Sequence, residues 1–228
     1  MTLSVESSAI RLASGCTITE PLARLVAFCV EEHAFYDAIP DLAPGQVTPI
    51  DVAITVAVNS FVNTATKLRS VQRGLALACD PLLATTAPGA RLDEPDGPSA
   101  AAALVDAAIT VPGVLVPVAT KVLHRKRPAL VPMLDQVVLD YYLDSSGNAH
   151  LRSSTQDKRR AGTTARVVLA HLRHDLVVAS DQLDLLCDAL ARVGYLLEPL
   201  RALDILLWTE IEPRGYYRRT SAAGAERP

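Results

Sequence analysis

The chain has 228 residues and a formal net charge of −3 at pH 7, with 50% hydrophobic and only 21% charged residues. This composition excludes an intrinsically disordered chain, which needs low hydrophobicity and high net charge. Aromatic residues make up 4% of the chain, so we expect an aliphatic core.

Helical periodicity dominates the first third of the chain. A helix is predicted after Thr19, with Pro21 in its first turn and an apolar stripe behind it. Thr48 and Asp51 predict the start of a second helix, as N-cap and as first-turn carboxylate. We expect this helix to continue through residues 52–68 as a buried, central element.

The middle of the chain contains the clearest predicted loop. Residues 68–79 read as a further helix, whereas residues 81–98 hold four prolines and are expected to form a loop that could separate two lobes. Helices are then predicted over residues 100–109 and from residue 113 to about 123. Asp135 is expected to begin another.

The last third reads as a series of helices. They are predicted over residues 158–178, 181–194 and 197–208, and no segment shows a well-bounded strand pattern. The sequence therefore predicts an all-α fold of about nine helices in one compact domain over residues 1–213, possibly arranged as two helical lobes. A basic tail follows at residues 214–228.

Uncharged stretches are too short to cross a membrane. The longest are residues 52–66 and 107–120, whereas a spanning helix needs about 20 apolar residues. The N-terminus lacks the pattern of a signal peptide. We therefore expect a cytoplasmic protein with no membrane partner, and the sequence leaves its oligomeric state open.

Charge is unevenly distributed along the chain. Residues 1–120 carry a net charge of −6, whereas residues 121–174 carry +6 and four of the five histidines. Such asymmetry is typical of a surface that meets an anion, often a nucleic acid. A solvated helix face would give the same pattern, and the low overall charge argues against a general DNA-coating role.

The most informative segment runs from the Pro-Gly turn at Pro112 and Gly113 to the apolar helix after Asp135. Between them lies a basic run that is predicted to end a helix, His124, Arg125, Lys126 and Arg127. These four residues are candidate nucleic-acid contacts. A solvated helix end, matched to the helix dipole, is the simpler interpretation. Asp135 is either an N-cap or a catalytic carboxylate at a helix N-terminus.

The run from Lys121 to Val138 resembles the signature of an uncharacterised family common in actinobacteria, K-x-L-x-R-K-R-P-x-L-x-P-x-x-D-x-V-V. Arg201, Asp204 and Trp208 resemble its second motif, and the likeness extends over residues 48–210. From their i, i+3, i+7 spacing we expect these three to be structural, as an Arg–Asp pair beside a core Trp.

A more distant similarity links this segment to helix-hairpin-helix DNA glycosylases. Val111 to Val114 resembles the start of their hairpin, although Leu115 replaces its second glycine, and Val131 to Asp135 resembles the segment that carries their catalytic Asp. The resemblance implies a base extruded from DNA into a pocket, with Asp135 and Lys121 as catalytic residues. It also implies that the cations at 124–127 bind phosphates and lower the pKa of Lys121.

Three functions remain open from sequence. A glycosylase-like enzyme requires Lys121 and Asp135 to face a shared, basic, accessible cleft. A non-enzymatic interaction module predicts that Asp135 only caps its helix and that the basic side chains point apart. A small-ligand binding protein predicts a closed apolar pocket. We expect no cofactor and no metal, since His171 and His174 have no identifiable third ligand.

Overall fold

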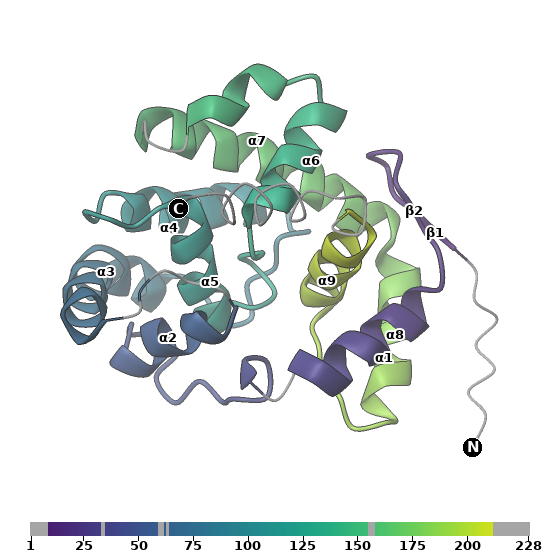
Figure 1. The fold of residues 1–228 in the computed structure, drawn as a ribbon, viewed down its shortest axis with the longest axis horizontal. Helices are drawn as coiled ribbons and strands as arrows, with labels where there is room; N and C mark the ends of the chain where they lie inside the picture. Colours follow the sequence, from purple (N-terminus) through teal and green to yellow (C-terminus); the bar gives the residue numbers. More distant parts are fainter. Residues whose placement is uncertain (1–8, 33–34, 59–61, 63, 155–157, 212–228) are drawn as a thin grey trace, which may run out of the picture.

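The computed structural model describes the chain apart from residues 1–8, 33–34, 59–61, 63, 155–157 and 212–228. Within the described residues there are nine α-helices and one very short β-hairpin, which confirms the predicted all-α fold (Figure 1). The helices are α1 (Pro21–Glu32), α2 (Pro49–Ile54), α3 (Ala65–Thr85), α4 (Gly97–Ile109), α5 (Val116–Lys126), α6 (Gln136–Ser145), α7 (Lys158–Val178), α8 (Ser180–Ala191) and α9 (Pro199–Ile211). The hairpin pairs β1 (Ile10–Arg11) with β2 (Thr17–Ile18), and two 3₁₀ helices, η2 (Thr55–Val58) and η3 (Ala149–Ser154), complete the set.

Two groups of helices share one core. Helix α4 packs against α3, α5 and α7, whereas α9 packs against α1, α6 and α8. Helix α9 is buried on all sides from Leu200 to Leu207, as expected of a helix that is apolar nearly all round. Most of the buried hydrophobic residues form one cluster that reaches from the β-hairpin to α9, and Tyr36, Ile54 and Met133 form a small second cluster. In Figure 1, α9 lies between α1 and α8 on one side and α5 and α6 on the other.

Several predicted helix boundaries agree with the structure. Helix α7 has the predicted bounds, and Asp135 is the N-cap of α6. Asp51 lies in the first turn of α2, where its Oδ2 accepts hydrogen bonds from the backbone N and the Oγ1 of Thr48, both at 2.7 Å. Local capping chemistry was therefore a reliable guide to where helices begin.

The predicted helix over residues 52–68 is wrong. Helix α2 ends at Ile54, η2 covers Thr55–Val58, and α3 begins only at Ala65. The predicted central helix is therefore not continuous. The predicted loop at residues 81–98 is also wrong in its first part, because α3 continues through Pro81 to Thr85. The carbonyl that Pro81 leaves without a helical donor belongs to Leu77, whose residue is 84% exposed, so water can satisfy it.

The hairpin β1–β2 was not predicted, because two-residue strands are too short to show alternation. The predicted helix–turn–helix around Pro112 is present as α4, a turn and α5, with Gly113 at a φ of +78°. The predicted tail at residues 214–228 lies outside the described residues. No helix in the described part of the chain is long and apolar enough to span a bilayer.

Candidate functional site

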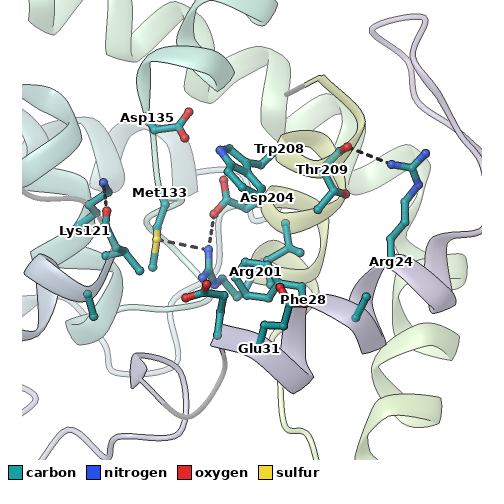
Figure 2. A pocket seen from close by; sticks show the side chains of 15 residues that line it. Arg24, Phe28, Glu31, Lys121, Met133, Asp135, Arg201, Asp204, Trp208 and Thr209 are labelled. Atoms are coloured by element: carbon teal, nitrogen blue, oxygen red, sulfur yellow. Dashed lines mark hydrogen bonds and ion pairs between the residues drawn. The ribbon is translucent and has the colours of Figure 1, made fainter. Parts of the chain in front are cut away.

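A cavity of about 510 Å³ opens between α1, η2, α5, the segment before α6, and α9. Its size is in the range of small-molecule pockets, about 300–1,000 Å³. Figure 2 shows Lys121 and Asp135 on the α5–α6 side and the α9 side chains opposite them. The lining that matters here comprises the cations Arg24, Lys121 and Arg201, the carboxylates Glu31, Glu32, Asp135 and Asp204, and the apolar side chains Phe28, Met133 and Trp208.

Asp135 caps helix α6 and also lines the cavity. Its Oδ1 accepts a hydrogen bond from the backbone N of Val138 at 2.9 Å, so it caps α6 as one interpretation of the sequence predicted. The backbone N–H of Val137 also donates to this carboxylate, and the side chain lines the cavity. Burial raises the pKa of Asp135, although the helix amides and the ammonium of Lys121 oppose that shift.

Lys121 extends from α5 into the same cavity. Its ammonium donates a hydrogen bond to the backbone carbonyl of Val58 in η2. Burial lowers the pKa of Lys121, against the opposing charges of Asp135 and Asp204. We expected the cations at 124–127 to lower this pKa, but burial is the main cause, and Arg201 is the cation that adds to it.

Arg201 and Asp204 form the predicted ion pair on α9. Arg201 Nη1 donates to Asp204 Oδ2 at 2.8 Å. The same guanidinium donates through Nε and Nη2 to Asp37, at 2.9 and 3.2 Å, and lies over the rings of Phe28 and Tyr36. Burial raises the pKa of Asp204 to about 7, despite the charge of Arg201.

Trp208 differs from the predicted core residue. It is only half-buried, and its side chain lines the cavity one helical turn beyond Asp204. Sequence reasoning missed Phe28, Met133 and Asp37 altogether. In the sequence, Phe28 and Met133 look like ordinary apolar residues, and Asp37 belongs to no motif. No local sequence signal therefore indicated any of the three.

The predicted nucleic-acid contacts at His124, Arg125, Lys126 and Arg127 are wrong. These residues are 3%, 8%, 2% and 1% exposed, so none offers its charge to a phosphate backbone. His124 Nδ1 pairs with the backbone carbonyl of Val131 at 2.7 Å. Burial, together with the charge of Arg201, lowers the pKa of His124 to about 4, so its ring is neutral near pH 7.

Arg125, Lys126 and Arg127 are paired with groups inside the protein and so stabilise the fold. Arg125 Nε lies 3.2 Å from Asp51 Oδ1, and Lys126 Nζ lies 2.6 Å from Asp51 Oδ2 and 2.7 Å from Asp41 Oδ1. Arg127 donates to backbone carbonyls of Pro44 and Thr86 at 2.7 Å each. A basic run followed by Pro is typical of an exposed helix end. Here contacts with residues 36–51 bury it instead.

The cavity is therefore shared and accessible, but it is not basic. Its lining carries four carboxylates and three cations, and Arg201 is already paired with two carboxylates. Arg24 is paired with Glu210 at 2.9 Å. Among the described residues, no group of three His, Cys, Asp or Glu side chains is placed to hold a metal ion.

A known protein family matches the part of the chain that forms most of the cavity. The model for the "Family of unknown function (DUF6308)" matches residues 31–211. The chain belongs to this family. The DUF6308 match includes Lys121, Asp135 and the whole α9 side of the cavity, whereas Arg24 and Phe28 precede it. No curated protein and no solved structure matches the chain.

The arrangement has definite chemical capabilities. A carboxylate at a helix N-terminus that lines a cavity can stabilise positive charge on a bound ligand or orient a water molecule. A buried lysine with a lowered pKa is a better nucleophile than an exposed one. Trp208 and Met133 supply an apolar surface for a flat ring. The cavity thus combines a buried lysine, a carboxylate and an aromatic wall.

Proposed function

We propose that this chain cleaves the N-glycosidic bond of a nucleobase substrate held in the cavity between α5, α6 and α9. The observation that carries the proposal is that Lys121 and Asp135 come from two elements and line one accessible cavity. The similarity of residues 111–135 to helix-hairpin-helix DNA glycosylases supports the same chemistry. A cavity of about 510 Å³ is large enough for a base together with its sugar.

Asp135 is the proposed catalytic carboxylate. When the bond between the anomeric carbon and the base nitrogen breaks, positive charge develops on the sugar ring. An ionised Asp135 stabilises that charge from the wall of the cavity, while the amides of Val138 and Val137 hold the carboxylate in place. The carboxylate therefore needs no movement during the reaction, which is what electrostatic catalysis requires.

Lys121 is the proposed nucleophile. Its neutral amine attacks the anomeric carbon, and the base leaves with the electron pair of the glycosidic bond and takes up a proton. The C1′–O4′ bond then breaks, O4′ takes up the proton that the attacking nitrogen loses, and the open-chain sugar is left as a protonated Schiff base of Lys121. Sodium borohydride should reduce that Schiff base and leave the sugar attached to the protein. We expect trapping of substrate by the wild type and none by Lys121→Gln, checked by mass spectrometry. Base release by the wild type with no trapped adduct would contradict this role for Lys121.

The pH profile of base release should reflect the burial of Asp135. The carboxylate must be ionised to act, and burial raises its pKa above the usual 3.8, against the helix amides, Lys121 and Arg201. Activity should therefore fall as the pH is lowered through a value above 3.8, while Trp208 fluorescence shows that the fold persists. An acidic limb that lies at or below the ordinary value would contradict the assignment.

DNA is the proposed source of the base, as the glycosylase resemblance implies. The buried cations at residues 124–127 cannot hold its phosphates, so backbone contacts must come from other surfaces. The proposal is tested with duplex and single-stranded oligonucleotides carrying uracil, hypoxanthine, 8-oxoguanine or an alkylated purine, alongside the free nucleosides. Released base is measured by chromatography. Release from free nucleosides alone would keep the chemistry and reject DNA as the partner.

A second candidate is a non-enzymatic interaction module. The specific observation in its favour is that Asp51 pairs with both Arg125 and Lys126 in the core, so much of the Lys121–Val138 motif is explained by folding alone. This candidate gives no role to the position of Asp135 and of the buried Lys121 ammonium in the lining of one cavity. Absence of base release from every substrate above, by a folded protein, would favour it.

A further inference from the structure

Helix α9 forms the cavity wall opposite Lys121 and Asp135. Arg201, Asp204 and Trp208 follow one another at i, i+3 and i+7, which places them on one face of the helix. All three line the cavity, and the proposed bond cleavage uses none of them. This wall is therefore free to serve recognition of the ligand.

Arg201 is held in place and cannot turn toward a ligand. Its Nε and Nη2 donate to Asp37, and its Nη1 donates to Asp204 Oδ2 at 2.8 Å and lies 3.3 Å from Met133 Sδ. Its guanidinium carbon lies 5.3 Å from the centre of the Phe28 ring. These contacts fix the donor that Arg201 presents to Asp204.

Asp204 consequently has two different oxygens. Oδ2 is occupied by Arg201, whereas Oδ1 accepts no hydrogen bond from any residue that the structure describes. Figure 2 shows that second oxygen directed away from Arg201. The residue is 3% exposed, so this acceptor is largely withdrawn from water, and a ligand with a suitably placed N–H donor would satisfy it.

Trp208 lies one helical turn from Asp204, on the same face. A planar ring that stacks on the indole would turn its edge toward the carboxylate, because side chains at i and i+4 are neighbours on a helix. The wall thus combines a surface for the face of a ring with a hydrogen-bond acceptor for its edge. Burial raises the pKa of Asp204 to about 7, so above that pH the carboxylate is ionised and its Oδ1 is an acceptor. In that state the wall fits a ring edge that carries a donor.

We infer that Asp204 recognises an exocyclic amino group on the edge of the bound nucleobase while Trp208 stacks on the face of its ring. This inference rests on the proposed function and names the substrate class more narrowly, as amino-bearing bases such as adenine- or cytosine-type rings. A base with an oxo group at the same position would place two acceptors against each other and bind more weakly.

The substitution Asp204→Asn should reverse this preference. Arg201 Nη1 still needs an acceptor, so the amide oxygen of Asn must face Arg201 and its NH₂ group must face the cavity. The wall would then offer a donor where the wild type offers an acceptor. An oxo-bearing base becomes the better ligand. A merely structural role for Asp204 predicts weaker binding of both bases, without reversal.

Trp208 is the only tryptophan in the chain, so its fluorescence reports directly on this cavity. The experiment is carried out at a pH well above 7, where the Asp204 carboxyl is ionised. It titrates adenosine against inosine, and cytidine against uridine, on full-length Asp135→Asn protein, which should bind without turnover. We expect the amino member of at least one pair to bind about tenfold or more tightly. Adding Asp204→Asn should reverse the order, and adding Asp184→Asn, on the exposed face of α8, should leave it unchanged.

Each outcome decides between the two claims. Equal binding of both members of each pair, or a preference that Asp204→Asn leaves unchanged, overturns the role of Asp204 and leaves the proposed bond cleavage standing. Binding of none of the four nucleosides, with a normal thermal unfolding transition, overturns the inference and counts against a nucleobase site in this cavity. Base release in the chromatographic assay tests the cleavage separately.

Discussion

Replacing Asp135 by Asn should abolish base release while leaving the fold intact. Asn and Asp are about equally good N-caps, so the hydrogen bond from Val138 N to residue 135 survives the change. What is lost is the negative charge beside the developing positive charge on the sugar. We expect the single-turnover rate of base release to fall about 100- to 1,000-fold, as when one electrostatic contact to a transition state is removed.

The substitution Asp135→Ala separates the two roles of this side chain. It removes both the charge and the cap, so it should lose the same activity and, in addition, about 1 kcal/mol of stability. Thermal unfolding measured for both variants checks this difference. An Asp135→Asn protein that keeps wild-type activity would show that Asp135 serves the helix alone, as the interaction module requires.

Replacing Asp51 by Asn should strongly destabilise the protein. Asp51 is completely buried and pairs with both Arg125 and Lys126, so the change leaves two buried cations with fewer counter-charges. Hydrogen bonds from Lys126 and Thr48 lower the pKa of Asp51 against the effect of burial, which shows how strongly its ionised form is held. Breaking a buried pair of this kind costs about 3–5 kcal/mol.

The matched control is Asp93→Asn. Asp93 pairs with Arg91 at 3.0 Å, but their side chains are 26% and 41% exposed, and exposed pairs contribute about 0–1 kcal/mol. In chemical denaturation the two variants should therefore differ by several kcal/mol in free energy of unfolding. Equal losses for Asp51→Asn and Asp93→Asn would refute the structural role of the buried cation cluster.

Local sequence signals predicted residues that line the cavity better than they predicted which charged residues are exposed. Asp135 and Lys121 were both predicted as site residues from the segment that contains them, and both line the cavity. The caps at Thr48 and Asp135 were also correct, because capping depends on a few neighbouring residues. These features are encoded within one or two turns of the chain.

The burial of the cation cluster at residues 124–127 could not be predicted from neighbouring residues in the sequence. Whether Arg125 and Lys126 face water depends on Asp51 and on the loop that contains Asp41, more than 70 residues earlier in the chain. The same limit applies to the cavity, which joins Phe28 of α1 to Trp208 of α9. Pairings over such separations leave no periodic pattern in the sequence, so local sequence signals do not predict them.

The most direct test of the account compares a charged and a neutral sugar mimic. A cationic pyrrolidine, in place of the sugar, imitates the charge of the transition state, and a tetrahydrofuran ring is its neutral counterpart. Each is titrated alone and within a duplex oligonucleotide, with Trp208 fluorescence as the signal. We expect the wild type to bind the pyrrolidine at least tenfold more tightly than the tetrahydrofuran, and Asp135→Asn to lose that preference. Equal binding of the two rings, or binding of neither by the folded wild type, would contradict the proposed catalytic role of this cavity.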